Sequence, residues 1–321
     1  MTEDEMKEKA EFLKTAFKDS KIKECFYFDH TDCSKDIIRS HSVQENKLLS
    51  RIAVNGKVIT KKKSYLPFNN TDEMGKAVAS TFTGFCKYHD NKLFMPIEDK
   101  PYIGSPLQKF LFAYRAFAYV AHKNLEQHKF METLANNANI PNPNIGLKCN
   151  VEKDTPFVNN LFKECFLKED YSNLITYEIT LDYEVSFCVS TSLTLVYDIS
   201  GRKINNLKDF SKHIHNLFLT IFPMDGKTTM LFSWFKYSDR IYRRWIYQLK
   251  SMSQDKMINY LNQMIINETE NFYLSPKLWE LWGKSGQDEM EQNFYWSMLF
   301  NLTKTDSKYT PQFNLFTNIN I

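Results

Sequence analysis

The chain has 321 residues, of which 43% are hydrophobic, 15% aromatic and 25% charged, and this composition excludes a disordered or low-complexity protein. The net charge of +3 does not by itself indicate a nucleic-acid partner, and it excludes none, because local clustering of charge decides such binding. No stretch approaches the roughly 20 apolar residues of a membrane span, and the acidic start lacks the features of a signal peptide. We therefore expect a cytoplasmic protein without membrane contact.

The first hundred residues predict mostly short elements. Residues 4–19 have the spacing of an amphipathic helix. Ile37 and Ile38 indicate a short strand, and residues 44–51 indicate a helical turn. Asn55-Gly56 separates two apolar segments, which predicts a two-residue hairpin between two strands.

The rest of the chain predicts a long helix and then an α+β region. Residues 106–135 form the predicted helix, behind a Ser105-Pro106 start. The segment 140–156 is rich in Pro, Asn and Gly, so we expect an N-terminal module over 1–140 and a C-terminal domain over 150–321. The β-branched and aromatic run 175–201 predicts two or three strands. Two further strands and then four helices are expected near 216–222, 228–235, 239–250, 254–271, 276–282 and 288–301.

Four cysteine and histidine residues in the first hundred have the spacing of metal ligands. Cys25 and Cys33 form one pair, and Cys86-x2-His89 forms a second pair after 52 intervening residues. Zinc is commonly held by two such close pairs, so we predict one structural zinc bound by these four residues, with His30 as an alternative to one cysteine. The competing interpretation is that the cysteines are buried apolar thiols. Three further cysteines lack a partner at ligand spacing and are interpreted as core or loop thiols: Cys149, Cys165 and Cys188.

Between the two pairs lies the segment Arg39-Ser40-His41-Ser42-Val43-Gln44. Together with the pairs, it resembles the HNH, or His-Me finger, nuclease module on a treble-clef zinc knuckle. The resemblance covers about 70 of the 321 residues. It implies that His41 is the general base that activates water and that Asp90 binds a catalytic Mg²⁺ or Mn²⁺.

The chain departs from the pattern of that family at two places. An acidic residue usually precedes the histidine, and here Ser40 stands there. Asp90 replaces a usual histidine of the helix, and the common further histidine gives way to Lys92 and Leu93. The order of the pieces is also similar to that of bacterial defence-type proteins with RSHS-like and GFCxxHD-like motifs, which implies a setting in antiviral defence.

Two clusters of basic residues are candidates for nucleic-acid contacts. Lys61, Lys62 and Lys63 follow the predicted hairpin and would neutralise phosphates, unless they only form a solvated hairpin end. A second cluster alternates arginine with aromatic residues on a predicted helix, a combination that suits both phosphate contacts and base stacking. In the alternative interpretation the aromatic residues of this cluster face the core. The cluster consists of Arg240, Tyr242, Arg243, Arg244, Trp245 and Tyr247.

These patterns predict an α+β chain with a treble-clef-like zinc module followed by an antiparallel sheet with covering helices. The leading hypothesis is a metal-dependent HNH-like endonuclease whose C-terminal domain selects the target or binds a partner protein. The alternative is a non-catalytic, zinc-stabilised sensor or adaptor that binds nucleic acid or protein. A nuclease requires His41 and Asp90 on one open face that a phosphate can reach, whereas a binding protein could bury His41.

Overall fold

The computed structural model describes residues 2–61, 71–141, 144–300, 305 and 309–319. Its centre is a seven-stranded sheet in which each described pair of neighbouring strands is antiparallel. The strands lie in the order β3 (Thr71–Gly75), β2 (Lys57–Lys61), β9 (Phe272–Leu274), β6 (Phe187–Leu193), β7 (Leu217–Met224), β8 (Lys227–Phe235) and β5 (Leu174–Leu181).

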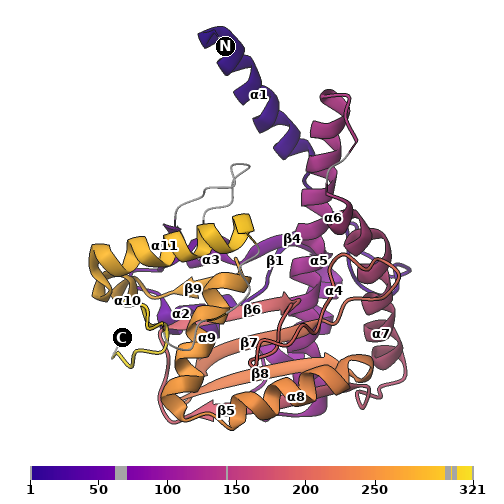
Figure 1. Cartoon of the computed structure of the whole chain (residues 1–321). Helices are drawn as coiled ribbons and strands as arrows, with labels where there is room; N and C mark the ends of the chain where they lie inside the picture. The colour runs from indigo at the N-terminus through magenta and orange to yellow at the C-terminus, as the bar shows by residue number, and fades with distance from the viewer. Residues whose placement is uncertain (1, 62–70, 142–143, 301–304, 306–308, 320–321) are drawn as a thin grey trace.

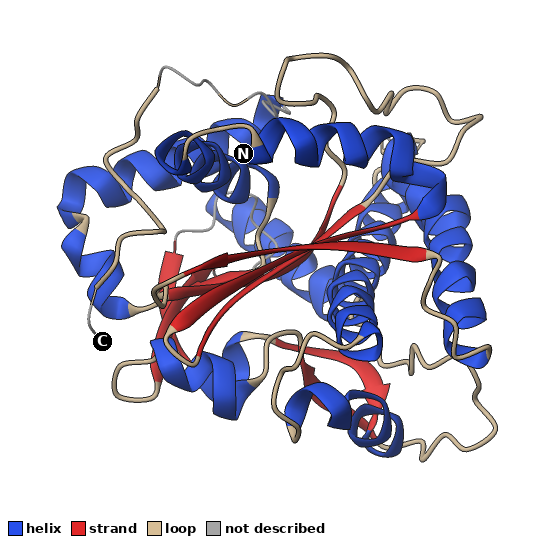
Figure 2. Cartoon of the chain, turned by 90° about the horizontal axis from the view of Figure 1, so that it is seen from below, coloured by secondary structure: helices blue, strands red, loops and turns tan. Residues whose placement is uncertain are grey.

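Helices cover both faces of this sheet (Figure 2). One face packs on α5 (Pro106–Asn137) and α7 (Thr155–Leu167). The other face packs on α8 (Asp239–Lys250), α9 (Gln254–Glu268), α10 (Pro276–Leu281) and α11 (Gly283–Phe300), with η3 (Lys236–Ser238) leading into α8. Side chains alternate between the faces of a strand, so both layers can share β7. Its Phe218 and Phe222 pack toward α5, whereas Leu217, Leu219 and Ile221 pack toward the other layer.

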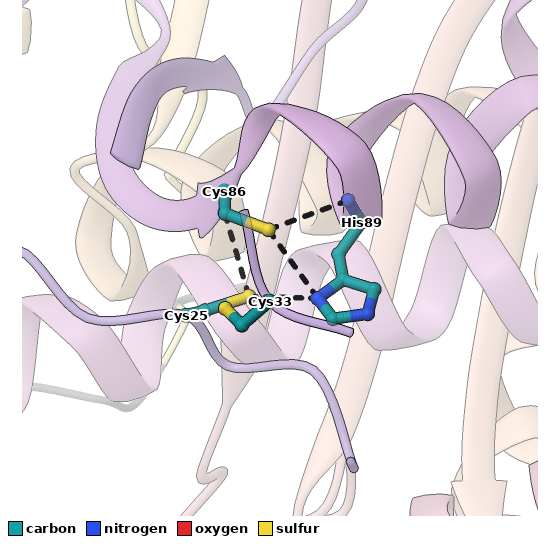
Figure 3. Close-up of side chains that lie close together, drawn as sticks. All are labelled: Cys25, Cys33, Cys86 and His89. Carbon is teal, nitrogen blue, oxygen red and sulfur yellow. Dashed lines mark hydrogen bonds between the residues drawn. The ribbon is translucent and has the colours of Figure 1, made fainter. Parts of the chain in front are cut away.

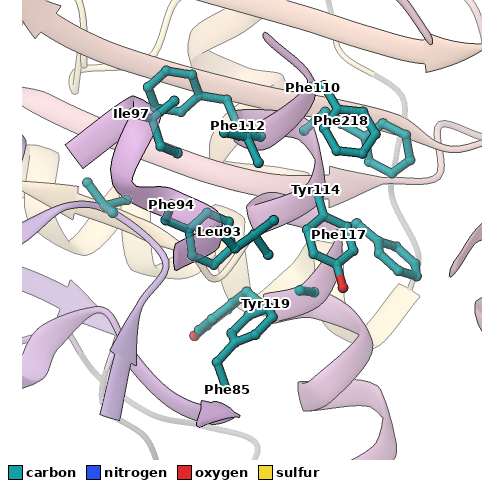
Figure 4. Close-up of a cluster of buried hydrophobic side chains, with 14 of the residues drawn as sticks. Phe85, Leu93, Phe94, Ile97, Phe110, Phe112, Tyr114, Phe117, Tyr119 and Phe218 are labelled. Atoms are coloured by element: carbon teal, nitrogen blue, oxygen red, sulfur yellow. The ribbon is translucent and has the colours of Figure 1, made fainter. Parts of the chain in front are cut away.

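A second, two-stranded sheet consists of β1 (Ile37–His41) and β4 (Thr81–Cys86), which pair antiparallel with Ile37 opposite Cys86. The chain passes from β4 directly into α4 (Lys87–Glu98). Aromatic side chains fix this unit against α5 (Figure 4). Phe85 of β4 packs edge-on against Phe94 of α4 at 5.1 Å, and both contact Tyr114 of α5. The unit therefore shares its hydrophobic core with the large sheet.

The N-terminal helix α1 (Glu3–Asp19) projects from the body of the molecule beside the end of α5 (Figure 1). The side chain of Thr2 caps its first turn, and Phe17 packs edge-on against Phe130 of α5 at 5.8 Å. Among the residues that the structure describes, none of the helices combines the length and the apolar character that a membrane crossing requires.

The predicted antiparallel sheet with covering helices is confirmed, and so are the long helix and the turn at Asn55-Gly56. Both turn residues have positive φ, 51° and 75°. The arm before this turn is helical, however, as η1 (Glu45–Leu49) and α2 (Ser50–Ile52), and β2 pairs with β3 instead. Helical spacing buries Leu48, Leu49 and Ile52 together, which a strand could not do.

Strands from either side of the expected boundary at 140–150 share the large sheet, because β2 and β3 join it through β9. The described part of the Pro- and Asn-rich segment is helical, as α6 (Ile145–Cys149) and η2 (Asn150–Asp154). The strand β9 and the short helix α3 (Lys76–Ala79) were not predicted, because three or four residues are too few for a periodic pattern.

Candidate metal centre

The second predicted ligand pair lies where β4 meets α4. Cys86 is the last residue of the strand and the N-cap of the helix, and its Sγ accepts a hydrogen bond from the backbone N–H of His89 at 3.5 Å. His89 therefore lies in the first turn, with its side chain directed back toward Cys86. The local rule of helix capping thus brings a C-x2-H pair together.

The first pair, Cys25 and Cys33, lies in the loop between α1 and β1. Hydrogen bonds hold this loop against β4, α5 and the start of α4. The N–H of Phe26 donates to the carbonyl of Gly84 at 2.7 Å. The hydroxyl of Tyr114 donates to the carbonyl of Phe26 at 2.6 Å. Near the other end of the loop, Lys87 N–H donates to the carbonyl of Asp36 at 2.9 Å.

The structure brings all four predicted ligands together, and we call this group the Cys/His cluster: Cys25, Cys33, Cys86 and His89. One ligand atom from each lies within 4.8 Å of the others (Figure 3). His89 Nδ1 is 3.5 Å from Cys25 Sγ and 3.3 Å from Cys86 Sγ. A tetrahedral zinc with ordinary bond lengths separates bound nitrogen and sulfur by about 3.6 Å, so these residues fit the ion.

The electrostatic surroundings differ between the thiols of the cluster. Burial raises the pKa of Cys25 to about 12. Burial opposes ionisation of Cys86 as well, but hydrogen bonds from the His89 N–H and from Ser34 outweigh it and lower the pKa of Cys86 to about 7. Burial lowers the pKa of His89, which favours the neutral imidazole that a metal requires. A dication would displace the remaining thiol protons.

One supporting residue of the cluster was not predicted from the sequence. The ring of Tyr27 stacks on the imidazole of His89, with centroids 3.8 Å apart and planes 13° from parallel. This contact fixes the orientation of the imidazole ring. An aromatic residue two positions after a cysteine is too common to have indicated it.

The remaining cysteines and His30 lie outside the cluster. His30 is exposed, and its backbone carbonyl accepts a hydrogen bond from the N–H of Cys33 at 3.2 Å. Its side chain is not part of the cluster, so the alternative ligand set with His30 receives no support. Cys165 and Cys188 are buried in the core, as predicted, and Cys149 is partly buried.

His41, the predicted general base, lies at the end of β1 with its side chain 18% exposed. Its Nδ1 is 2.8 Å from Ser80 Oγ, and its Nε2 is 3.5 Å from a carboxylate oxygen of Glu45. Both ring nitrogens thus have protein partners.

Asp90, the predicted ligand of the catalytic metal, lies in the first turn of α4 and is only 9% exposed. Burial raises the pKa of its carboxyl group, and the nearby Arg115 guanidinium offsets this only in part. Arg115 is itself buried and donates to Glu98 at 2.6 Å. Among the described residues, the Cys/His cluster is the group of three or more Cys, His, Asp or Glu side chains that could hold a metal, and neither His41 nor Asp90 belongs to it.

Lys61, the first residue of the predicted phosphate-binding run, is 8% exposed. Its ammonium group lies 4.1 Å from the ring centroid of Phe294, and burial lowers its pKa to about 8. This placement gives no support to a phosphate contact by Lys61. Lys62 and Lys63 lie outside the described residues.

Comparison with known proteins found no matching family model, no similar curated protein and no similar solved structure. The site therefore defines a class of protein by its chemistry alone: a mixed α/β chain with antiparallel sheets and a Cys₃His group that could bind a metal such as zinc.

Proposed function

We propose that the Cys/His cluster binds one structural zinc ion and that the chain is a zinc-stabilised binding protein. The observation that carries this proposal is the set of four protein ligands, three of them thiols, gathered within 4.8 Å. Zinc sites with four protein ligands are structural, whereas catalytic sites keep a position open for water or substrate.

The zinc would add a bond between two segments that lie far apart in the sequence. Cys25 and Cys33 belong to a loop without regular structure, whereas Cys86 and His89 belong to the β4–α4 junction. Metal binding would therefore contribute directly to the folding of the first ninety residues. The order of loop, hairpin and helix also supports our inference that this unit is a treble clef.

Metal analysis of the purified protein tests this proposal. We expect about one zinc per chain, and its loss in Cys86→Ser. Cys149→Ser, which removes a thiol outside the cluster, is the matched control and should retain the metal. Freshly purified wild-type protein without zinc, or equal loss of zinc in both variants, would contradict the proposal.

A second candidate is the HNH-like nuclease, which one feature favours. The two-stranded sheet of β1 and β4, followed by α4, carries His41 and Asp90 in the order of the family that the sequence resembles. Two features favour the binding protein instead. Asp90 is buried, and the two ring nitrogens of His41 contact Ser80 and Glu45.

Cleavage assays separate the two candidates. Single- and double-stranded DNA and RNA would be incubated with the wild-type protein in Mg²⁺ or Mn²⁺, alongside His41→Ala and Asp90→Asn. A histidine remote from the hairpin, His213, which contacts Asp154, provides the control variant His213→Ala. The nuclease would be established, and the binding proposal displaced, by metal-dependent cleavage that is lost in His41→Ala and in Asp90→Asn but retained in His213→Ala.

A further inference from the structure

The helix α8 divides its aromatic residues between the core and the surface. Tyr242 and Trp245 are buried against the sheet, and Tyr242 donates a hydrogen bond to the carbonyl of His215 at 2.6 Å. Tyr247 is 58% exposed. The alternative that the aromatic residues of this helix face the core therefore holds for two of them and fails for the third.

Positive charge gathers around this exposed tyrosine. Four exposed cations lie on α8, and two more lie in the adjoining loop 198–203, against only two carboxylates, Asp198 and Asp239. Asp198 joins the loop to the helix, because its carboxylate is 3.3 Å from Arg244 Nε and accepts from Gln248 at 3.4 Å. The six cations are Arg202, Lys203, Arg240, Arg243, Arg244 and Lys250.

This concentration is unusual for the chain, whose net charge is only +3. The two carboxylates are also occupied within the protein. Asp198 is buried and accepts from Ser200 and from the N–H of Arg202, and Asp239 accepts from Arg243 at 2.6 Å and from the indole of Trp234. The surface therefore presents guanidinium and ammonium groups to an approaching ligand.

Aromatic rings lie among these cations. The side chain of Tyr247 contacts that of Tyr177 on β5, and Lys250 Nζ lies 5.5 Å from the centroid of the Tyr177 ring. Tyr197, next to the loop, is 37% exposed. In Figure 1, α8 lies over the sheet next to β8 and β5.

We propose that this α8 surface binds single-stranded nucleic acid. Arg240 and Lys250, on the exposed side of the helix, would contact phosphates, and Tyr247 would stack on an unpaired base. In a duplex the bases are stacked on each other, so a duplex would contact the cations of this surface but would not stack on the ring of Tyr247. An acidic peptide such as polyglutamate has no flat base to stack on the ring, so its binding would not depend on Tyr247. The inference names the partner of the proposed binding protein and so depends on that proposal, but the surface is separate from the Cys/His cluster.

Fluorescence anisotropy with labelled single-stranded RNA and DNA of about 20 nucleotides tests the inference. The double variant Arg240→Glu/Lys250→Glu should weaken binding at least about tenfold and reduce the slope of log K against log salt by about 0.7 for each phosphate that is no longer neutralised. Tyr247→Ala should weaken binding of the single strands about tenfold while leaving the duplex unchanged, and Tyr247→Phe should restore it. The core side chains of α8 are untouched in these variants, so melting temperature serves as the folding control.

Lys9→Glu/Lys14→Glu, two exposed cations of α1, is the matched charge control and should bind as the wild type does. No binding at about 50 mM salt, or equal weakening in the α1 control, would overturn the inference. Polyglutamate binding as tightly as RNA, with no effect of Tyr247→Ala on either ligand, would overturn it in favour of an acidic protein partner. Zinc content is measured on the same samples, so a failure of the metal proposal is seen separately from a failure of this surface.

Discussion

The Cys/His cluster and the pair His41 and Asp90 lie in the same part of the molecule, around β1, β4 and α4, yet their surroundings differ. In the cluster, three sulfur atoms and one ring nitrogen face each other at ligand distances. His41 instead contacts Ser80 and Glu45, and Asp90 lies near Arg115, which is bonded to Glu98. The Cys/His cluster is therefore compatible with a metal-stabilised fold. His41 and Asp90, the two predicted catalytic residues, are each engaged in separate contacts within the protein.

Ligand spacing is therefore a stronger signal than the resemblance to a catalytic motif. Two ligand pairs need only a loop and the start of a helix to meet, and the capping geometry at Cys86 brings one pair together. A catalytic pair also requires exposure and free coordinating atoms. Exposure and free coordinating atoms depend on which other segments of the chain pack against β1, β4 and α4.

Removing the metal should have the largest effect. A strong chelator is expected to lower the free energy of unfolding by several kcal/mol, and the melting temperature by about 5 °C or more, because zinc binding and folding are coupled. Calorimetry before and after chelation measures this, with zinc added back as the control. An unchanged melting temperature would show that the Cys/His cluster has no structural role.

Arg115→Ala should have the next largest effect, because it leaves Glu98 and Asp90 without their buried counter-charge. We expect a decrease of about 3–5 kcal/mol in the free energy of unfolding by urea. Arg39→Ala, at an exposed position on the same hairpin, should change stability by less than about 0.5 kcal/mol. Equal small effects of the two variants would show that the surroundings of Asp90 do not depend on this ion pair.

Tyr27→Ala should weaken zinc binding about tenfold, because the tyrosine ring holds the imidazole of His89 in place. Tyr27→Phe keeps the stacked ring and should retain the wild-type affinity. Competition with a chromophoric chelator measures both variants. An alanine variant with unchanged affinity would indicate that the backbone alone orients His89.

His41→Ala should have the smallest effect, about 1 kcal/mol, because it removes a partly exposed ring that interacts with Ser80 and Glu45. The zinc content should not change, because His41 lies outside the cluster. Urea unfolding and metal analysis on the same sample test both statements. Loss of zinc in this variant would contradict the separation of the two regions.

The sequence determined the elements whose signals are local. Long apolar periodicity predicted α5, and the strands expected near 216–222 and 228–235 correspond to β7 and β8. The two close Cys and His pairs predicted which side chains would meet, because two ligand pairs can be read without knowledge of the intervening chain. On α8 the sequence left open whether the aromatic residues face the core, and the structure buries Tyr242 and Trp245 but not Tyr247.

Features that depend on contacts between distant segments became visible in the folded molecule alone. Folding brought β2 and β3 into one sheet with β9, across some two hundred residues, and it placed the ammonium group of Lys61 against Phe294. It also buried Asp90 beside Arg115 and left Tyr247 exposed beside Tyr177. Burial and exposure are properties of the packed molecule, because the solvent that a side chain meets is set by neighbours far away in the chain, and no local pattern encodes those neighbours.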